Sequence, residues 1–406
     1  MSGEWDVLNF LTSIFLFFKV NTSQSVKLHL SSYEVYMKLK NIKEDIVICE
    51  DELQQLLKRP ESAISKYNLI YTYEVDLIII RKKHGKGFTY FLDGNRIKSK
   101  NELDRLKKLV IPPMWKDVKI SPNENSHLQA VGIDAKGRKQ YLYHEKWNIL
   151  RNSTKFYKMY SFGKKLPIIR KQLELDLNKK GWPKDKVVAL IIRLMEETHI
   201  RIGNSQYEKQ NKSYGLTTLR KRHINVYKDR LSIEYIGKKG IAHKVSLRNK
   251  KLIRLVNRCE ELPGWTLFKY IDEDGEKKTI KSSHVNEYLQ HMCGTDFTAK
   301  DFRTWSASVS FFNALMALGK ASSEKDIKSN IISAFDIAAN TLGNTRSVCK
   351  KYYVHPFIIQ HYENGNLYKT FDKIKKNTKV DAYLSCSEKE ILKLIKTYNP
   401  IQTDLK

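Results

Sequence analysis

Cysteine is scarce in this sequence and is not paired. The five cysteines are odd in number, widely spaced and form no Cys-x-x-Cys motif; they are Cys49, Cys259, Cys293, Cys349 and Cys386. This spacing argues against a disulfide-framed secreted domain and against a cysteine-based zinc or redox site. We therefore expect buried or idle thiols in a reducing, cytoplasmic setting.

Long hydrophobic runs are also missing. The most apolar stretch, residues 7–20 (VLNFLTSIFLFFKV), is shorter than the about 20 residues that span a bilayer. It follows Glu4 and Asp6, where a signal peptide would carry basic residues. We interpret it as a packed helix or a disordered extension, with membrane contact as the minor alternative.

The machinery for nucleotide or metal chemistry is absent from the sequence pattern. There is no GxxxxGK[ST] loop to cradle phosphates, and no cluster of carboxylates has metal-ligand spacing. His223, His243 and His355 are scattered, while His127 and Trp115 are expected to be structural. The sequence therefore shows no motif of an ATP-driven enzyme or of a metal-dependent nuclease. We expect no cofactor, no nucleotide and no metal.

Acidic residues are too few to balance the basic ones. The 406 residues are 41% hydrophobic and 29% charged, as in a globular protein, but 73 Lys and Arg face 44 Asp and Glu, a net charge of +29. Such a charge indicates a polyanionic partner, nucleic acid before an acidic membrane surface. Residues 1–80 hold 8 basic and 11 acidic side chains, whereas residues 81–406 hold 65 and 33. The polyanion therefore binds after residue 80.

The length of the chain predicts several domains, and its separate runs of strand-like and helical segments predict the α+β class. We expect a partly helical extension over 1–66 with a helix broken at Pro60, a β-rich domain over 67–148, a linker over 149–165, a mostly helical domain over 166–365 and a Lys-rich tail over 366–406. Strands are predicted at 69–73, 75–80, 88–92, 118–120 and 141–143, then at 216–219, 223–227, 230–236 and 244–247. The main helices are predicted at 184–203, 300–319 and 329–343. The first carries an apolar stripe of Val187, Leu190, Ile191, Leu194 and Met195.

Basic residues stand at several predicted turns and helix ends. Arg201 follows a long helix, Lys238 lies in the turn of a hairpin and Arg303 begins another helix. Each is weak alone, because such residues are ordinarily solvated or contact phosphate. Phosphoryl transfer without metal, however, needs fixed cations around the non-bridging oxygens and an acid for the leaving oxygen. A tyrosine nucleophile would complete such a transesterification.

Five collinear segments carry a more specific signal. They are IPPMWKDVKISPNENSHLQAVGIDAKGRKQYLYH (111–144), RIGNSQYEKQNKSYGLTTLRKRHI (201–224), IGKKGIAHKV (236–245), KDFRTW (300–305) and LGNTRSVCKKYYVHP (342–356). This set resembles the type IB DNA topoisomerases, most of all the small poxvirus and bacterial enzymes, over roughly residues 67–365. The resemblance implies a β-rich domain and a helical catalytic domain of the tyrosine recombinase and type IB topoisomerase fold, forming a bilobed clamp around duplex DNA. It also implies relaxation of positive and negative supercoils by a monomer, without ATP or metal.

The same resemblance assigns the nucleophile. Tyr353 would attack the scissile phosphodiester, form a 3′-phosphotyrosyl bond and expel a 5′-hydroxyl; Tyr352 competes by adjacency only. In the family the nucleophile stands nine residues after the polar residue of the LG-x-T motif, here Asn344. Poxvirus enzymes carry His at that position and bacterial relatives carry Asn, which donates a hydrogen bond but no proton. Arg346, where bacterial sequences usually have Pro, is either a phosphate contact or a surface residue.

The remaining catalytic roles also come from the resemblance. Arg201 and Arg303 correspond to the two arginines that stabilise the transition state through hydrogen bonds to the non-bridging oxygens. Lys238 corresponds to the general acid for the leaving 5′-oxygen. Lys300 corresponds to a further lysine that assists at the site in poxvirus enzymes.

The segment KGRKQYLYHEK (136–146) alternates cations with aromatic residues, which suits a strand or turn along a DNA groove. An exposed basic hairpin with half-buried tyrosines is the alternative from pattern alone. By the resemblance, the expected DNA contacts are Arg138, Lys139, Gln140, Tyr141, Tyr143 and Tyr207.

Two other functions would explain part of the sequence. A tyrosine recombinase shares the catalytic fold and chemistry but usually carries His three residues before the second arginine, where this chain has Lys300. A non-enzymatic DNA-compacting protein would explain the charge but not the ordered set of candidate residues. The resemblance leaves the source open, so the expected location is a bacterial nucleoid, or a virion or viral replication site.

Overall fold

The computed structural model describes residues 55, 59–294, 297–376 and 381–398. The predictions for the apolar run 7–20 and for most of the extension 1–66 lie outside the described residues, although a helix does begin at Pro60 (α4, Pro60–Ala63). The chain divides between Thr154 and Lys155 into two compact units. Both units mix helices with antiparallel sheets, which confirms the α+β class.

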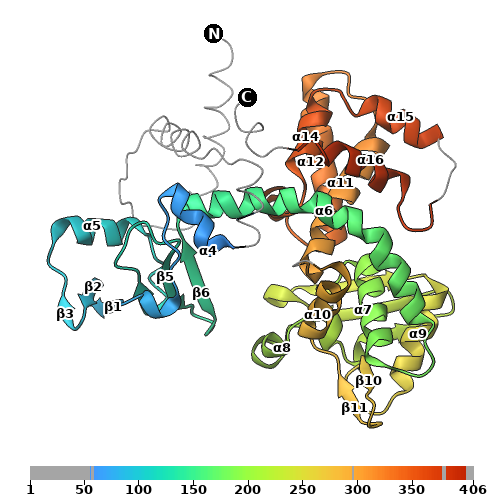
Figure 1. Ribbon diagram of the computed structural model, residues 1–406, viewed down its shortest axis with the longest axis horizontal. Helices are drawn as coiled ribbons and strands as arrows, with labels where there is room; N and C mark the ends of the chain where they lie inside the picture. The colour runs from blue at the N-terminus through green and yellow to red at the C-terminus, as the bar shows by residue number, and fades with distance from the viewer. Residues whose placement is uncertain (1–54, 56–58, 295–296, 377–380, 399–406) are drawn as a thin grey trace. The chain divides into compact units, whose positions relative to one another are not determined.

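The first unit is built on a six-stranded antiparallel sheet of order β3-β2-β1-β4-β5-β6 (Figure 1). Its strands are β1 (Ile79–His84), β2 (Gly87–Leu92), β3 (Asn95–Arg96), β4 (Lys116–Ile120), β5 (Leu128–Ile133) and β6 (Lys139–Tyr143). Helix α5 (Lys100–Lys108) contributes Leu106 to the core that Ile79, Val118 and Ile120 form on the sheet. The helix therefore covers one face of this sheet.

Two strand predictions need correction in this unit, and two strands, β3 and β5, were not predicted. Residues 69–73 form no strand, since only Ile70 makes a bridge, and residues 74–76 form a 3₁₀ turn, so β1 begins at Ile79 rather than at 75. Tyr73 and Val75 are exposed. Their side chains favour a strand only where they pack against a sheet, and here they do not. Strand β5 gave no strand signal in the sequence, because its first five residues are all buried and lack the alternation of a half-exposed strand.

A buried arginine fixes the loop that leads into β4. The Arg81 guanidinium donates hydrogen bonds to the carbonyls of Ile111, Pro112 and Trp115 at 2.9–3.0 Å. The Trp115 ring packs so close to Gly132 that a Cβ there would lie 2.9 Å from it. The IPPMW segment is thus structural, and Trp115 is a packing residue as predicted. His127 is buried too, and its Nδ1 accepts a hydrogen bond from the backbone of Thr72.

Helix α6 (Glu145–Leu177) runs across the boundary between the units and includes the whole of the expected linker, 149–165. It contains Pro167, which cannot donate to the preceding turn, and Figure 1 shows that the helix changes direction along its length. The other helices of the second unit are α7 (Lys184–Thr198), α8 (Ser205–Asn211), α9 (Lys250–Glu261), α10 (Ser282–Cys293), α11 (Ala299–Leu318), α12 (Glu324–Leu342), α13 (Arg346–Tyr352), α14 (Pro356–Glu363), α15 (Tyr368–Lys376) and α16 (Cys386–Ile395).

Small sheets complete the second unit. The order β7-β8-β9 joins β7 (Ile224–Val226), β8 (Leu231–Ile236) and β9 (Ala242–Leu247), and a hairpin pairs β10 (Lys269–Ile271) with β11 (Lys277–Thr279). The strand predicted at 216–219 is wrong, because residues 216–218 form a 3₁₀ turn. The Thr218 hydroxyl bonds both to the Gly215 amide and to its carbonyl, which favours a turn over a ladder.

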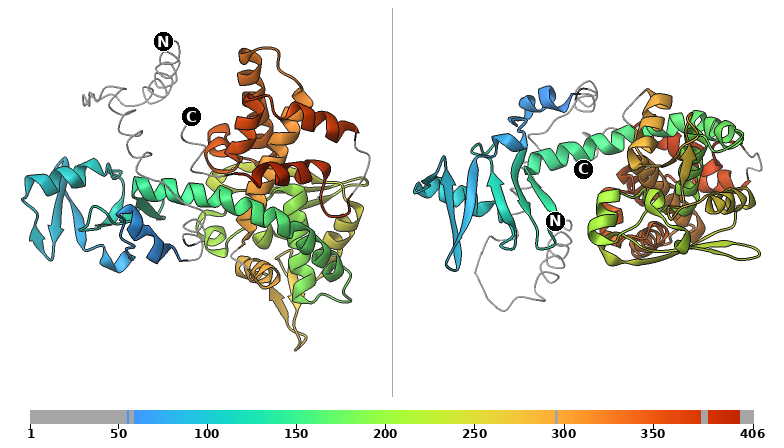
Figure 2. Two further views of the ribbon diagram at one scale, coloured as in Figure 1. Left: turned by 45° about the horizontal axis from the view of Figure 1, so that its top comes forward. Right: turned by 90° about the horizontal axis from the view of Figure 1, so that it is seen from below.

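Helices α7 and α11 form the centre of this unit (Figures 1 and 2). The predicted apolar stripe of α7 is buried, and so are Ala189 and Ile192 on its other faces. Helix α11 buries Phe302, Trp305 and Phe311. Because both helices are enclosed, the residues at their ends are held by packing on several sides.

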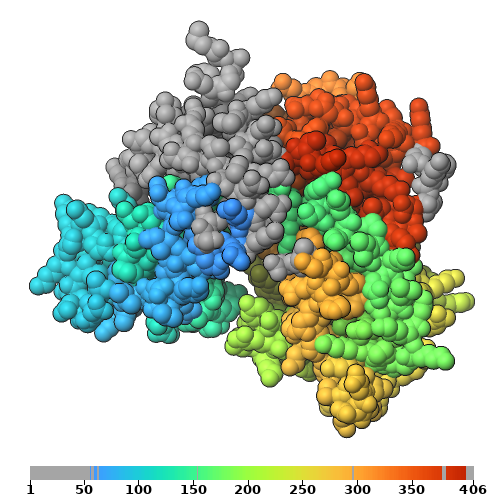
Figure 3. Space-filling view, in the orientation of Figure 1, coloured from blue at the N-terminus to red at the C-terminus, as the bar shows by residue number. Residues whose placement is uncertain are grey.

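The Lys-rich segment from residue 366 is part of the folded unit as far as Tyr398. Helices α15 and α16 contribute Phe371, Ile391 and Ile395 to the same core. In the space-filling view these C-terminal elements (red) adjoin the green surface of α6 (Figure 3). The predicted domain bounds remain a prediction, but this segment carries core residues.

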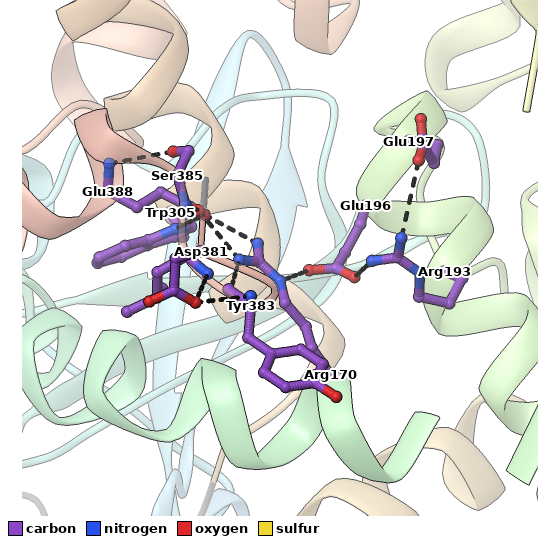
Figure 4. A network of polar contacts seen from close by, with 10 residues as sticks. Arg170, Arg193, Glu196, Glu197, Trp305, Asp381, Tyr383, Ser385 and Glu388 are labelled. Atoms are coloured by element: carbon purple, nitrogen blue, oxygen red, sulfur yellow. Dashed lines mark hydrogen bonds and ion pairs between the residues drawn. The ribbon is translucent and has the colours of Figure 1, made fainter. Parts of the chain in front are cut away.

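A polar network attaches α16 to the unit (Figure 4). The Arg170 guanidinium donates two hydrogen bonds to the Glu388 carboxylate, at 2.8 and 3.0 Å, and one to Glu196 at 2.9 Å. The indole of Trp305 also donates to Glu388, at 2.9 Å. Although burial alone raises the pKa of Glu388, the bonds from Arg170 outweigh it and the pKa is lowered. The carboxylate is therefore held as an anion.

Removing this carboxylate should destabilise the second unit. Glu388→Ala leaves Arg170 with Glu196 and the Tyr383 carbonyl as acceptors and removes the acceptor of the Trp305 indole, which should reduce the free energy of unfolding by about 3–5 kcal/mol. Urea unfolding followed by tryptophan fluorescence measures this. Glu390→Ala on the same helix, whose partners Lys373 and Lys393 are exposed, should cost less than about 1 kcal/mol. Equal effects of the two variants would contradict the prediction.

The same network predicts an acid dependence. Because the pKa of Glu388 is lower in the folded state, its stabilisation is complete above its unfolded pKa of about 4.3 and is lost as the pH falls through the lowered value. The difference in stability between wild type and Glu388→Ala should therefore shrink below about pH 4.

Candidate active site

The loop that carries Arg201 is shaped by close backbone contacts. Helix α7 ends at His199, a left-handed C-cap with φ 54°, and the chain turns away. Gly203 (φ 95°) and Gly215 then bring two segments together, since a Cβ on Gly215 would lie 2.5 Å from the Arg201 carbonyl. That carbonyl accepts a hydrogen bond of 2.8 Å from the Leu216 amide. The backbone of Arg201 is thereby fixed.

The Arg201 side chain reaches the residue that follows α12. Its Nη2 donates a short hydrogen bond to Asn344 Oδ1. Gly343, with φ 59°, ends α12 in the left-handed conformation that glycine favours, and the Asn344 amide bonds back to the Ala339 carbonyl at 2.9 Å. In the described part of the chain Asn344 Nδ2 is buried and has no hydrogen-bond partner. The Asn344 side chain also lies close to the buried Cys349 thiol, whose pKa burial raises and the Asn344 side chain acts to lower.

Arg303 is buried in α11 with 5% of its surface exposed. Its Nη2 donates to the Leu342 carbonyl at 2.8 Å and its Nη1 to the His199 carbonyl. These carbonyls belong to the C-terminal ends of α12 and α7, where the helix dipoles place partial negative charge. Burial and then nearby Arg201 lower the pKa of Arg303, but a guanidinium stays protonated. Among the described residues its buried Nε has no partner.

Tyr353 lies beside this arginine. It follows α13 as the C-cap, its amide bonds to the Cys349 carbonyl at 3.0 Å, and its carbonyl accepts a 3.2 Å bond from Ser308 Oγ. Its ring centroid is 5.6 Å from Arg303 Cζ. Tyr352, by contrast, is 41% exposed. The geometry thus brings Tyr353 to the buried arginine.

The two predicted lysines are exposed. Lys238 begins the 3₁₀ turn Lys238–Gly240 between β8 and β9, and Lys300 stands in the first turn of α11, three residues before Arg303. Within the described ranges no hydrogen bond or ion pair joins either ammonium group to the other predicted catalytic residues. Side-chain contacts therefore bring Arg201, Arg303, Asn344 and Tyr353 together. Lys238 and Lys300 are located only by the turn and the helix that carry them.

The predicted DNA-contact residues of the first unit lie on or next to β6. Arg138 and Gln140 both bond to the Asp134 carboxylate, at 2.8 and 2.9 Å. The Lys139 ammonium pairs with Glu74 at 2.7 Å, although both side chains are largely exposed. Arg138 and Gln140 are thus held by Asp134, and a DNA backbone would compete with Glu74 for Lys139.

The aromatic members of the set are accessible. Tyr141 is 46% exposed and stacks on Tyr143 with ring centroids 6.2 Å apart. Tyr207 belongs to the second unit, on α8, and is 53% exposed. Arg346, whose role was open, forms a two-fold hydrogen bond with the Asp336 carboxylate at 2.5 and 2.6 Å on an exposed surface. The surface interpretation of Arg346 is therefore favoured.

The described ranges contain no group of three or more His, Cys, Asp or Glu placed to hold a metal ion. None of the described helices is long and apolar enough to cross a membrane. Cys259, Cys293 and Cys349 are free and buried, as predicted, and burial raises the pKa of each thiol.

Comparison with known proteins decides the family. The family described as "Eukaryotic DNA topoisomerase I, catalytic core" matches residues 144–387, and "Bacterial DNA topoisomerase IB, N-terminal domain" matches residues 87–134. DNA topoisomerase 1B of Acanthamoeba polyphaga mimivirus is 35% identical over 295 residues, which cover 71% of this chain and 88% of the relative. The chain belongs to the type IB DNA topoisomerase family.

More distant relatives agree. DNA topoisomerase 1B of vaccinia virus (strain Copenhagen) is 26% identical to this type IB topoisomerase over 266 residues, which cover 63% of the chain and 77% of the relative. DNA topoisomerase activity, an isomerase activity, is the function that the family carries. The tyrosine recombinase considered from the sequence gains no support from these matches.

Several groups around the site of this type IB topoisomerase were not predicted from its sequence. Ser308 Oγ bonds to the Tyr353 carbonyl and accepts from the His355 amide, and Lys155 Nζ bonds to the Tyr352 carbonyl. The carbonyls of His199 and Leu342 hold Arg303. A backbone carbonyl is present in every residue type, so the sequence does not show which carbonyl will accept a hydrogen bond. Ser308 lies five residues after Arg303 on α11, about 140° away around the helix, so the helical period does not link the two residues in the sequence either.

Proposed function

We propose that this type IB topoisomerase relaxes supercoiled duplex DNA by reversible single-strand transesterification at Tyr353. The observation that carries the proposal is the convergence of Arg201, Asn344, Arg303 and Tyr353 at the C-terminal ends of α7, α12 and α13. Two cations and an amide donor are therefore fixed beside one phenol, which suits a phosphodiester in transit.

The proposed chemistry is a balanced exchange of two phosphoester bonds. The Tyr353 phenol oxygen releases its proton to water and bonds to phosphorus, the bond from phosphorus to the 5′-oxygen breaks, and Lys238 protonates that oxygen. Arg303 Nε and the Arg201 guanidinium would donate to the non-bridging oxygens as charge builds there. The reverse steps reseal the strand. One phosphoester replaces another, so no ATP is needed.

Side-chain chemistry limits the proton donor to the lysines of the predicted set. Asn344 can donate a hydrogen bond through Nδ2 but cannot transfer a proton. Arg201 and Arg303 do not deprotonate in proteins. Lys238 and Lys300 are the members of the predicted set that can supply a proton; the family resemblance assigns the general acid to Lys238 and an assisting role to Lys300.

Trapping the covalent complex tests the proposal. Supercoiled plasmid is incubated with the full chain and EDTA, without ATP, and the reaction is quenched with denaturant. We expect relaxation of both signs of supercoiling and a protein adduct on the DNA 3′ end, mapped to Tyr353 by peptide mass spectrometry. An adduct on the 5′ end, attachment at another residue, or strand exchange between paired sites in place of relaxation would overturn it.

A general acid at Lys238 predicts a substrate-dependent defect. Lys238→Ala should cleave a normal strand about 10²–10⁴-fold more slowly, because the 5′-oxygen leaves unprotonated. A 5′-phosphorothiolate substrate, whose sulfur needs no proton, should restore the rate. Single-turnover cleavage measures both. Lys239→Asn is the matched control, since Lys239 has φ 67° and Asn tolerates that conformation. If the sulfur substrate brings no restoration, Lys238 is not the acid.

The interaction with DNA completes the proposal. The basic excess after residue 80 would grip phosphates without sequence preference and with strong salt dependence. The six predicted contact residues, Arg138, Lys139, Gln140, Tyr141, Tyr143 and Tyr207, would add groove and backbone contacts. We propose that a monomer acts on duplex DNA without nucleotide, in the cytoplasm or at a viral replication site.

A further inference from the structure

One imidazole occupies a slot between two glycines next to the candidate active site. A Cβ on Gly237 would lie 2.5 Å from Cδ2 and 2.7 Å from Nε2 of His243. A Cβ on Gly343 would lie 2.6 Å from Cε1 and 3.0 Å from Nδ1 of the same ring. Any side chain at either glycine would collide with the ring. The imidazole therefore fills the whole space between two backbone segments.

Those two segments carry predicted catalytic residues. Gly237 directly precedes Lys238, and Gly343 directly precedes Asn344, which accepts the hydrogen bond from Arg201. The hairpin turn carries the proposed general acid, and the helix end carries the amide donor. The turn and the helix end thus pack against opposite edges of one ring. A change in the width of this ring would change the distance between them.

The sheet register holds the ring in place. His243 is the cross-strand partner of Tyr235, and the rings stack with centroids 5.1 Å apart and planes inclined by 16°. The next pair, Glu234 and Lys244, is joined by an ion pair of 2.9 Å. Within the described part of the chain His243 Nε2 is buried without a hydrogen-bond partner. Packing, rather than hydrogen bonding at Nε2, fixes this side of the ring.

The ring is also uncharged at neutral pH. Burial, followed by the nearby Arg201 and Arg303 cations, lowers the pKa of His243 below its usual value. It therefore adds no third cation beside the arginines, and its contribution is one of shape.

We propose that His243 is a positioning residue that sets the separation of the Lys238 turn from Asn344 and so aims the general acid at the leaving 5′-oxygen. The inference rests on the proposed role of Lys238. It goes beyond that role because it names the group that places the acid relative to the phosphate-binding residues.

The test compares two leaving groups. His243→Ala should empty the slot and let the turn shift, and a misplacement of about 1 Å costs about 10²-fold in rate. Single-turnover cleavage by the full chain should slow by about that factor on the normal substrate. On the 5′-phosphorothiolate substrate the variant should cleave close to the wild-type rate, because no proton has to be delivered. DNA binding should be unchanged.

Two outcomes would overturn the proposal. Equal slowing on both substrates would mean that His243 supports the site as a whole, and no slowing on either would mean that the ring does not position the acid. If His243→Ala does not fold, as judged by thermal melting and DNA binding, His243→Phe carries the same test. Its wider ring crowds the slot, so it should show the same dependence on the leaving group.

Further variants separate this inference from the role of Lys238. Lys238→Ala is measured on the same substrates, and failure of sulfur to rescue it would remove the proposed acid itself. If Lys238→Ala is rescued and His243→Ala is not, only the positioning role fails. The double variant should be no slower than Lys238→Ala alone, since both changes affect one proton transfer. His291→Ala, at an exposed histidine of α10, is the control and should match wild type.

Discussion

Tyr353→Phe is expected to abolish DNA relaxation and the covalent adduct while leaving DNA binding at the wild-type level. The substitution removes the phenol oxygen, which is the only atom proposed to bond to phosphorus, and keeps the ring that packs beside Arg303. A plasmid relaxation assay, denaturant trapping and a gel-shift measurement of affinity check the three parts.

The adjacent tyrosine provides the matched control. Tyr352 is exposed, and Lys155 contacts its carbonyl and its ring, both of which remain when the hydroxyl is removed. Tyr352→Phe should therefore relax DNA at nearly the wild-type rate. Relaxation by Tyr353→Phe, or its loss in Tyr352→Phe alone, would show that the nucleophile is wrongly assigned.

Arg303→Lys should reduce the rate of strand cleavage by about 10²–10³-fold, the usual effect of removing one transition-state donor. The planar guanidinium holds two helix ends through Nη1 and Nη2 while Nε stays available. An ammonium keeps the charge but cannot reproduce this arrangement. Single-turnover cleavage at saturating enzyme isolates the chemical step.

The free energy of unfolding of Arg303→Lys should fall as well, because a lysine side chain cannot reach both carbonyls. A buried carbonyl that loses its donor costs about 1–3 kcal/mol. Arg346→Ala is the control, since that exposed arginine pairs only with Asp336 among the described residues. It should leave cleavage and stability near wild type. A similar loss of rate in Arg346→Ala would return that residue to the phosphate contacts.

Three helices of the second unit were predicted from the sequence. The segments 184–203, 300–319 and 329–343 correspond to α7, α11 and α12, and the apolar stripe of the first gave the clearest helical period. Strand β5 was missed because it is buried on both faces and shows no alternation. The two false strands at 69–73 and 216–219 contain strand-forming residues, but the first segment makes only the Ile70 bridge and residues 216–218 are held in a 3₁₀ turn.

The candidate site was only partly accessible from sequence. Motif resemblance supplied Arg201, Arg303 and Tyr353, and the structure brings them together. It could not supply the carbonyls that hold Arg303, because every residue has one, nor the slot of His243, because a packed ring looks like any isolated histidine in a sequence. The roles of Lys238, Lys300 and the β6 residues stay predictions, since no contact in the described ranges joins them to a reacting group.

The helix-end carbonyls around Arg303 have a consequence for DNA binding. Most surface arginines lose several rotameric states when they grasp a phosphate, and this lost entropy opposes binding. Arg303 has already lost that freedom in the folded protein, because Leu342 and His199 hold its guanidinium. An incoming phosphate therefore meets a rigid cation. We expect a smaller unfavourable entropy of association at this residue than at the exposed lysines, and an active site that needs little rearrangement before cleavage.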